Sequence, residues 1–469
     1  MAENGGVKAV FVPPDGGPRG WLNVLGSFLL QSSSYGYVSA CGVFQLYYKT
    51  VLLPGYPSQT LGWITTVAVC LIFGACLPTG YIIDRYGIRS VTAPSAGLGL
   101  ASIGLLSLCT KYWQILLCQG FALGFACCGM MLSGVVCVTQ WFSTRRGLAV
   151  GVASAGGGFG GVIYPIMVAR LIDQHDFPTA VKWSALPLGM GMLFGVLICE
   201  SPFPSRRTKG RQAKREAPEE PSAAIEVPQS EESKAESGVA SQGPSAAGSL
   251  DSGDLERQAQ KSGVLRSLRS GGLAWPCFAV GVFFCMFSLL APLNYLPEMA
   301  RETGTSLSLS QYTLSIINAG QMFGRILPGW LSDYAGPLTT MTLVSGMSAI
   351  AMLVIWLPLN FYPNYAGIVF FAAFYGLSCG GCMSLASPCV AALAKGKVHD
   401  LGVKMGIACS FMAIGSLVGV PIIGLIKEST NSFDGLIATA GVTMVSIFLT
   451  VLEMDCPLLN ASYFNILRV

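Results

Sequence analysis

Gly80-Tyr-Ile-Ile-Asp84-Arg85-Tyr-Gly87 and Gly329-Trp-Leu-Ser-Asp333-Tyr-Ala-Gly336 are two stretches of this chain with one shared spacing, Gly-x3-Asp-x2-Gly. Each stretch follows a long apolar segment. A second set of residues recurs at nearly the same offset, with Gly147, Gly151, Gly160 and Pro165 in the first half and Gly402, Gly406, Gly415 and Pro421 in the second. The two repeats predict that the chain consists of two related halves.

The composition indicates that lipid surrounds most of the chain. Of its 469 residues, 52% are hydrophobic and 11% are charged, whereas soluble domains average about 25% charged. The net charge of +4 does not require a nucleic-acid partner. The chain has no GxxxxGK[ST] nucleotide loop, which argues against an ATP-driven pump. Cys379-Gly-Gly-Cys382 lies in an apolar segment without a second ligand pair, so we predict no metal and no cofactor.

A hydrophilic run from Glu200 to about Gly272 separates the halves. It almost lacks aromatic residues and cannot bury enough apolar surface to offset the entropy of ordering. We therefore predict a disordered linker at 200–274 between a six-helix bundle at 21–199 and a second one at 275–452. The predicted tails are residues 1–20 and 453–469.

A membrane crossing needs about 20 mostly apolar residues. Six segments on each side of the linker meet this requirement, and the predicted fold is an all-α membrane fold of twelve transmembrane helices in two pseudo-symmetric six-helix bundles. The predicted spans of the first half are 21–47, 61–83, 91–108, 113–139, 147–171 and 181–198. Those of the second half are 275–296, 311–331, 341–357, 366–393, 403–426 and 436–451.

Basic residues collect on one side of the predicted membrane. An even number of spans places both termini and the linker on that side, together with Lys8, Arg19, Arg85, Arg89, Arg145, Arg146, Lys395, Lys397, Lys404 and Arg468. The other side carries only Lys49, Lys111, Arg170, Lys182, Arg301 and Lys427. The positive-inside rule then predicts that both termini and the linker are cytoplasmic. We predict the plasma membrane as the location, with a vacuolar or other organellar membrane as the alternative.

Arg325 is the strongest indication of a binding site. It lies about 12 Å along its helix from Asp333, near mid-depth in the bilayer. An arginine at this depth costs about 2.5–3.5 kcal/mol and usually faces a cavity or a partner. No other predicted span has a carboxylate near mid-depth, so we predict that the substrate supplies the counter-charge. The alternative is an arginine satisfied by backbone carbonyls or by neighbours such as Asn318 and Gln321.

Parallel repeats about an axis along the membrane normal are the plan of the major facilitator fold, whose substrate site lies at the repeat interface near mid-depth. The run Gln31-Ser-Ser-Ser-Tyr35 places polar side chains inside the first span. Some of these side chains are predicted to line the site, although helix–helix hydrogen bonds would produce the same pattern. The predicted substrate-binding residues are Arg325, Gln321, Asn318, Tyr35 and Gln31.

The repeated motif predicts a latch on the cytoplasmic side. Its glycines allow close helix approach, and its aspartates can accept hydrogen bonds from helix N-termini or from arginines across the bundle. The predicted gating residues are Asp84, Arg85, Arg89, Arg145, Arg146 and Asp333. The alternative is that the arginines are ordinary charges at the membrane interface.

Two further motifs carry a family resemblance. Pro14-Asp15-Gly16-Gly17-Pro18-Arg19-Gly20-Trp21 resembles the Asp-Gly-Gly-x-x-Trp signature of the monocarboxylate porter family, in a fungal-type form. Trp141-Phe142-Ser143-Thr144-Arg145-Arg146-Gly147-Leu148-Ala149 is similar to the family's second signature, Tyr-Phe-x-Lys-Arg-Arg-x-Leu-Ala. Arg325 falls where the family has its substrate-binding arginine. The resemblance covers nearly all the spans and implies a secondary transporter, in animal members often a proton-coupled carrier of lactate-like monocarboxylates.

Two positions depart from the family pattern. Proton-coupled members have an Asp where this chain has Gln321, and a Lys where it has Ser39. Glutamine cannot take up and release a proton near neutral pH. Fungal-type relatives include vitamin uptake carriers and proteins associated with export of secondary metabolites, so the resemblance leaves the substrate and the direction open.

We predict a secondary active transporter that moves a small organic acid, or a related anionic or polar metabolite, by alternating access. The alternatives are an exporter of a bulkier secondary metabolite and a non-transporting nutrient sensor. We do not expect an enzyme, because His175 and His399 lie in loops on opposite sides and no acid–base pair is assembled in the membrane. The predicted partners are a small-molecule substrate, a proton if transport is proton-coupled, and the lipid bilayer, with no nucleic acid.

Overall fold

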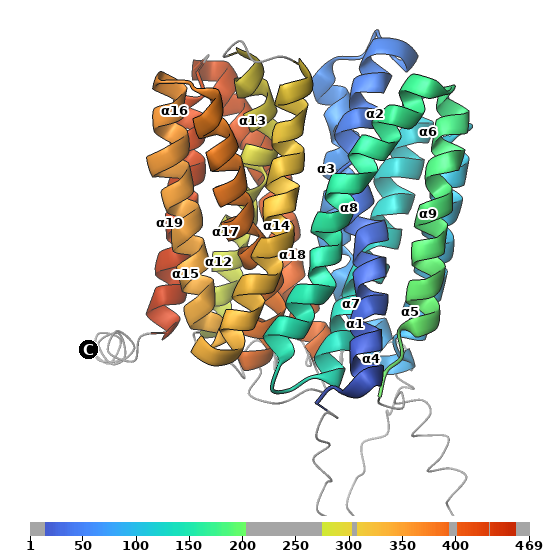
Figure 1. The fold of residues 1–469 in the computed structure, drawn as a ribbon, viewed down its shortest axis with the longest axis vertical. Helices are drawn as coiled ribbons and strands as arrows, with labels where there is room; N and C mark the ends of the chain where they lie inside the picture. The colour runs from blue at the N-terminus through green and yellow to red at the C-terminus, as the bar shows by residue number, and fades with distance from the viewer. Residues whose placement is uncertain (1–14, 203–273, 303–306, 394–400, 431, 456–469) are drawn as a thin grey trace, which may run out of the picture.

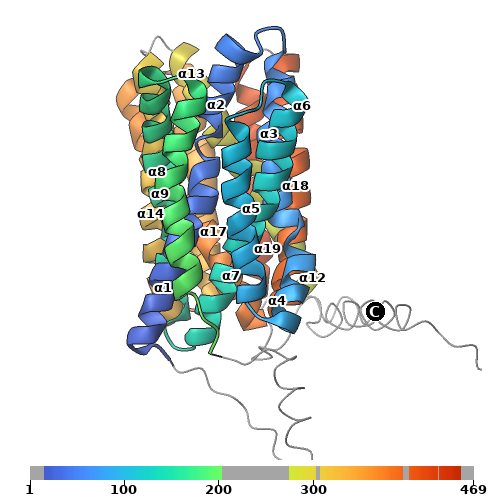
Figure 2. The ribbon, with the colours of Figure 1, turned by 90° about the vertical axis from the view of Figure 1, so that its right-hand side faces the viewer.

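The computed structural model describes residues 15–202, 274–302, 307–393, 401–430 and 432–455, and all regular structure in these ranges is helical. Figure 1 shows two groups of long helices side by side, the first coloured blue to green and the second yellow to red. Figure 2 shows that the helices run nearly parallel from one end of the molecule to the other.

The first group ends with α9, and the second begins with α12. We call the end of the molecule where α9 ends and α12 begins the linker side; it lies at the bottom of Figure 1. The first group consists of α1 (Gly17–Gln31), η1 (Ser32–Gly36), α2 (Cys41–Tyr47), η2 (Tyr48–Leu52), α3 (Ser58–Gly74), α4 (Cys76–Tyr86), α5 (Arg89–Leu106), α6 (Tyr112–Ile115), η3 (Leu116–Ala122), α7 (Leu123–Trp141), α8 (Arg146–Gln174) and α9 (Phe177–Ile198), where η marks a π-helical segment.

The second group has the same plan of long helices joined by short turns. It consists of α12 (Ala274–Leu289), α13 (Ala291–Glu302), α14 (Leu307–Ala335), α15 (Pro337–Ile350), η4 (Ala351–Trp356), α16 (Leu357–Phe361), α17 (Tyr365–Leu393), α18 (Leu401–Thr430) and α19 (Asp434–Asp455). Several consecutive segments, such as α3 and α4, together form one span. Counted in this way, the helices of the two groups confirm the predicted membrane fold of 12 spans in two bundles.

Nine helices in the described ranges are long and apolar enough to cross a membrane. The helices at the predicted spans 21–47, 91–108 and 311–331 are not among them. The first of these carries the polar run 31–35, and the last carries Arg325. Two of the three helices thus carry polar side chains within the span that the fold requires.

Large apolar side chains on the outside of the bundles fit a lipid environment. Trp63 of α3, Leu197 of α9 and Phe370 of α17 are 48%, 62% and 59% exposed. On a soluble protein, so many large exposed apolar side chains would be unusual. In a bilayer they form the surface that faces lipid, because the backbone polar groups are satisfied inside the helices.

The first predicted span differs from the expectation of one continuous helix. A π-helical segment, η1, follows α1, and the helix breaks at Ser39 and Ala40 before α2 begins. The segment packs closely against α8, since a Cβ atom on Gly36 would lie 2.6 Å from the Cα of Gly160. Such an approach is possible only with glycine on both helices.

The predicted linker and tails fall largely outside the described residues. The same holds for several of the basic residues used to orient the chain, namely Lys8, Lys395, Lys397 and Arg468. The boundaries at 21–199, 200–274 and 275–452 therefore stay predictions.

Replacing Gly160 with alanine tests the contact between η1 and α8. The added Cβ would lie 2.5 Å from the carbonyl oxygen of Ser32 and 2.9 Å from the Cα of Gly36. We expect Gly160→Ala to lower the free energy of unfolding by about 1–3 kcal/mol, the range for overpacking. The measurement is the thermal melting of the purified protein.

Gly97→Ala is the matched control, because a Cβ at Gly97 would meet nothing within 4 Å. Alanine is also the better helix former by about 1 kcal/mol, so this variant should melt at or above the wild-type temperature. Equal destabilisation by the two variants would contradict a close backbone contact at Gly160.

Candidate functional site

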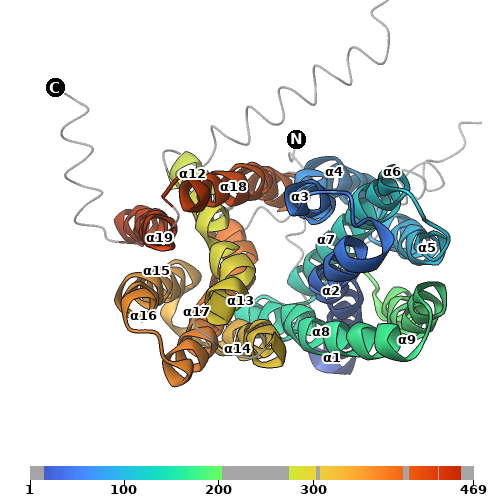
Figure 3. The ribbon, with the colours of Figure 1, turned by 90° about the horizontal axis from the view of Figure 1, so that it is seen from above.

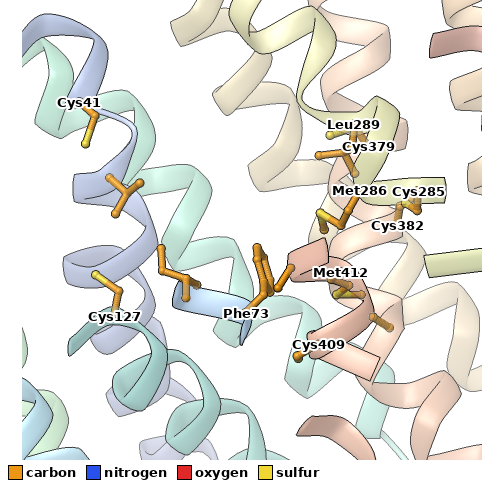
Figure 4. Packing of buried hydrophobic residues seen from close by; sticks show 14 of the residues in the cluster. Cys41, Phe73, Cys127, Cys285, Met286, Leu289, Cys379, Cys382, Cys409 and Met412 are labelled. Atoms are coloured by element: carbon orange, nitrogen blue, oxygen red, sulfur yellow. The ribbon is translucent and has the colours of Figure 1, made fainter. Parts of the chain in front are cut away.

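The two bundles meet mainly along two helix pairs. α8 packs against α14, with further contacts to α17, and the pair α3 and α4 packs against α18. Figure 3 shows both pairs at the junction of the groups. At the second pair, Figure 4 shows Phe73 of α3 extending toward Cys409 and Met412 of α18.

Glycines bring the backbones of α8 and α14 into contact. A Cβ on Gly151 would lie 2.3 Å from the carbonyl oxygen of Arg325, and a Cβ on Gly329 would lie 2.5 Å from the carbonyl oxygen of Gly147. Gly329 opens the second copy of the repeated motif. Both contacts lie in the half of each helix nearer the linker side, so the bundles are held together there.

Arg325 lies at this interface and is only 3% exposed. Its Nη1 donates to the carbonyl oxygen of Ser154 on α8 at 2.5 Å, and its Nη2 donates to Oε1 of Gln321 at 3.3 Å. The guanidinium lies over the ring of Tyr35, 5.2 Å from its centroid. Nε of Arg325 has no hydrogen-bond partner among the described residues.

The guanidinium of Arg325 is therefore held by neutral groups in this conformation, and none of them neutralises its charge. Within the described part of the chain, no carboxylate forms an ion pair with it. A backbone carbonyl, an amide and an aromatic face surround it, as the alternative interpretation of the sequence expected. The cation–π contact with Tyr35 is of a kind worth about 2 kcal/mol or more when desolvated.

Four of the five predicted substrate-binding residues gather near one another. Asn318 donates from Nδ2 to the carbonyl oxygen of Gly161 at 3.0 Å, across the same interface, and its Oδ1 has no partner among the described residues. Gln321 and Tyr35 contact Arg325 directly. Gln31 lies apart from this group.

The amide of Gln31 donates to the carbonyl oxygen of Met131 on α7 at 3.3 Å, inside the first bundle. Tyr35 belongs to the π-helical segment η1, which follows Gln31 directly, and it contacts Arg325 of the other bundle. Only Tyr35 reaches the α8–α14 contact.

Asp333 caps α8 from the opposite bundle. Its Oδ1 accepts a hydrogen bond from the N–H of Gly147 at 2.6 Å, and its Oδ2 accepts one from the N–H of Leu148 at 2.9 Å. α8 has no side-chain cap at Arg145, its own N-cap residue. The carboxylate satisfies two of the N–H groups that the first helical turn leaves free, and the helix dipole favours its charge.

Three of the predicted arginines bond to groups of the first bundle. Arg85 donates from Nη1 to the hydroxyl of Tyr81 at 3.0 Å, and Arg146 donates from Nε to the carbonyl oxygen of Phe142 at 3.0 Å. Nη2 of Arg89 lies 3.9 Å from Oε1 of Glu200. The structure therefore places the helix terminus, rather than an arginine, directly on Asp333.

Asp84 lies at the equivalent place on α4, in the helix pair that contacts α18. α4 approaches α18 closely, since a Cβ on Gly406 would lie 2.6 Å from the Cα of Leu77. The two copies of the repeated motif thus sit at the two helix pairs that join the bundles.

Asp15 has a structural role that the spacing of residues did not reveal. Its Oδ1 accepts from the N–H groups of Ser143 and Thr144 at 2.7 and 2.8 Å, and its Oδ2 accepts from their hydroxyls at 2.7 and 2.5 Å. Partial burial alone would raise the pKa of this carboxyl, but the hydrogen bonds from Thr144 and Ser143 outweigh it and hold the pKa well below its usual range. The only signal in the sequence is that each residue belongs to a signature motif.

A surface hollow of about 520 Å³ lies at the turn between α8 and α9, at the other end of α8. Its lining residues are Asp173, Gln174, His175, Asp176 and Thr179. Within the described ranges, no group of three or more His, Cys, Asp and Glu residues could hold a metal ion. The α8–α14 contact around Arg325 is therefore the candidate site.

A sequence model of the Major Facilitator Superfamily matches residues 24–420. The chain belongs to this superfamily. It is therefore an integral membrane transporter and not an enzyme. Members of the superfamily carry small-molecule substrates, sometimes together with protons.

The chain is similar to named fungal transporters over most of its length. It is 44% identical to the MFS-type transporter hasB of Aspergillus fumigatus, over 92% of this chain and 88% of that protein. It is 28% identical to the fujikurins efflux protein of Gibberella fujikuroi, over 92% of this chain and 81% of that protein.

A solved structure of the superfamily shows the same fold. The proton:xylose symporter XylE, with bound 6-bromo-6-deoxy-D-glucose, superposes with a TM-score of 0.64 over 93% of this chain and 94% of its own. The two sequences are 15% identical, so the likeness concerns the arrangement of helices only.

Asp333→Asn tests the cap on α8. Asparagine removes the charge and turns one of the two acceptors into an amide donor, which cannot bond the N–H of Leu148. Loss of a hydrogen bond to a charged group costs about 1.5–3 kcal/mol, so we expect amide exchange at the start of α8 to become about tenfold to hundredfold faster. The measurement is hydrogen–deuterium exchange with mass spectrometry on peptides spanning residues 143–150.

Asp173→Asn is the matched control, because Asp173 is an exposed carboxylate at the opposite end of α8. It should leave exchange at residues 143–150 unchanged. An Asp333→Asn variant with wild-type exchange in this peptide would show that the cap does not stabilise the helix start.

Proposed function

We propose that this transporter exports a secondary metabolite, in which Arg325 contacts an anionic or polar group, by alternating access of the two bundles. The direction is supported by the relatives, since the fujikurins efflux protein is named for export. The main expectation from the sequence, transport of a small organic acid, has less support from these relatives.

The contact with substrate is supported by the surroundings of Arg325. The guanidinium is held by one carbonyl, one amide and one aromatic ring, and its Nε is unsatisfied among the described residues. A buried cation surrounded only by neutral groups gains more from an anion than from any of them. Gln321, Asn318 and Tyr35 are the proposed neighbours of the bound group, and Gln31 is not included.

Alternating access then requires Arg325 to change partners. In the present conformation it joins α14 to the backbone of α8 near the linker side. A substrate anion that draws the guanidinium away from Ser154 removes one of the contacts that close this interface. Substrate binding and opening of the interface would thus be linked through one side chain.

Within this proposal, both termini and the linker side are cytoplasmic, as the distribution of basic residues predicts. The plasma membrane is the proposed location. The proposed latch consists of Asp333 of α14, which caps the start of α8, and of Asp84 at the second helix pair. Arg145 and Arg146 lie next to the capped terminus and favour the charge of Asp333, whereas Arg85 and Arg89 contact Tyr81 and Glu200 inside the first bundle. Coupling to protons is not part of the proposal, because Gln321 replaces the acid on which proton-coupled monocarboxylate porters rely. The resemblance to that family stays a prediction.

Deleting the gene for this protein in its source organism tests export. We expect at least one anionic metabolite to move from the medium to the cell interior, as measured by mass spectrometry of both fractions. Wild-type protein should restore the profile. Arg325→Gln should lower release by about tenfold or more, because a charge-assisted contact is worth about 1.5–3 kcal/mol. An unchanged metabolite profile after deletion would contradict the export function.

Arg325→Lys is the matched variant, because it keeps the charge but loses the planar fork of donors. It should retain more export than Arg325→Gln. Equal export by wild type and Arg325→Gln, at equal amounts of protein in the membrane, would refute the charge contact.

Uptake of labelled lactate into proteoliposomes separates export from transport of a small organic acid. We expect no lactate accumulation, with or without an inward proton gradient. Accumulation stimulated by the gradient would favour the monocarboxylate symporter instead, and would require a proton site other than Gln321.

A further inference from the structure

The segment before α1 is fixed to the loop before α8 by several contacts besides those of Asp15. The N–H of Gly16 donates to the carbonyl oxygen of Trp141 at 3.3 Å, and the ring centroids of Trp21 and Phe142 lie 5.4 Å apart in an edge-to-face arrangement. Asp15, Gly16 and Gly17 all have positive φ angles, of 53°, 106° and 75°. This backbone suits glycine at the last two positions and costs energy at Asp15.

The strained turn aims the carboxylate of Asp15 at the loop. A non-glycine residue persists in this region only where surrounding contacts hold it there. Here the four hydrogen bonds from Ser143 and Thr144 are those contacts. The loop cannot move relative to α1 without breaking them.

Two carboxylates from different bundles hold adjacent parts of the same short stretch. Asp15 accepts from the N–H groups of Ser143 and Thr144, and Asp333 accepts from those of Gly147 and Leu148. Only Arg145 and Arg146 lie between the two pairs. The position of Ser143 and Thr144 therefore sets the direction in which the N–H groups of Gly147 and Leu148 point.

We propose that Asp15 is a positioning residue for the contact between the bundles. By fixing the loop at 143–144, it presents the first N–H groups of α8 to Asp333 and so stabilises the conformation closed on the linker side. The Asp-Gly-Gly motif acts on the conformational equilibrium from outside the substrate site. This inference goes beyond the proposed function, because it does not depend on the substrate or on the direction of transport.

The loop has other supports, so loss of Asp15 should leave the fold intact. Nε1 of Trp141 donates to the carbonyl oxygen of Glu200 at 2.7 Å, and the N–H of Glu200 donates to Oδ1 of Asn23 at 2.6 Å. These bonds and the Trp21–Phe142 contact hold the near end of the loop. Among the described side chains, Asp15 is the one that accepts the hydrogen bonds of Ser143 and Thr144.

A distance measurement between the bundles tests the proposal. Spin labels are attached to unnatural amino acids at positions 90 and 339, exposed sites on the linker side of each bundle, so that the native cysteines stay in place. Pulsed electron spin resonance on the full-length protein in lipid nanodiscs, without substrate, then gives the populations closed and open on the linker side.

Asp15→Ala should raise the ratio of open to closed by about fivefold or more, the lower limit of typical coupling between sites. Asp333→Asn should shift the ratio in the same direction. The double variant should shift it no further than Asp333→Asn alone, because both residues act through the start of α8. Asp173→Ala, at the far end of the same helix, should leave the ratio at the wild-type value.

An unchanged ratio in Asp15→Ala would overturn the proposal, and so would effects of Asp15→Ala and Asp333→Asn that add in full. Thr144→Val serves if Asp15→Ala yields no folded protein. It removes one hydrogen bond to Oδ2 of Asp15 and keeps the side-chain shape, so it should shift the ratio in the same direction by a smaller factor; no shift would again overturn the proposal. Since no substrate is present, this outcome is independent of the export experiment.

Discussion

The closed arrangement of this transporter depends on a carboxylate of one bundle that completes the first turn of a helix in the other. α8 starts without a side-chain cap of its own, and Asp333 supplies the missing acceptors. The bond is possible only because Gly147 and Gly329 let the two backbones touch. Once the helices lie at this distance, Arg325 can reach the carbonyl oxygen of Ser154 and Asn318 can reach that of Gly161. One close contact thus sets the geometry of the candidate site.

Neutral groups keep the cation of Arg325 buried, but none of them neutralises its charge or bonds its Nε. An ion pair inside the bundle would fix Arg325 strongly, because truncation of such a pair costs about 3–5 kcal/mol. The carbonyl, amide and ring around it hold it less strongly, so its position can respond to a ligand. Gln321 in particular accepts a hydrogen bond without carrying a charge, which keeps the site positive over the physiological pH range.

Much of this arrangement could be predicted from the sequence, because glycine, proline and aspartate at repeated spacings report backbone requirements. The two-bundle fold, the burial of Arg325 and the placement of Asp333 at a helix contact all followed from such spacings. For Asp333 the sequence left two kinds of partner open, a helix N-terminus and an arginine, because backbone N–H groups look alike at every helix start; the structure shows the N-terminus of α8. Gln31 was predicted in the site because it belongs to the polar run 31–35, and the alternative explanation of that run, a helix–helix hydrogen bond, applies to it: its amide bonds the carbonyl oxygen of Met131. Asp15 bonds a loop far along the chain, and no local pattern encodes such a pairing.

The cap on α8 has a consequence for how the protein is made. The first bundle leaves the ribosome well before α14 is synthesised, because the whole stretch 203–273 comes between them. Until α14 arrives, the N–H groups of Gly147 and Leu148 have no acceptor from Asp333, and the start of α8 must be satisfied by water or lipid headgroups at the membrane surface. The start of α8 therefore reaches its final form only when the second bundle assembles against the first.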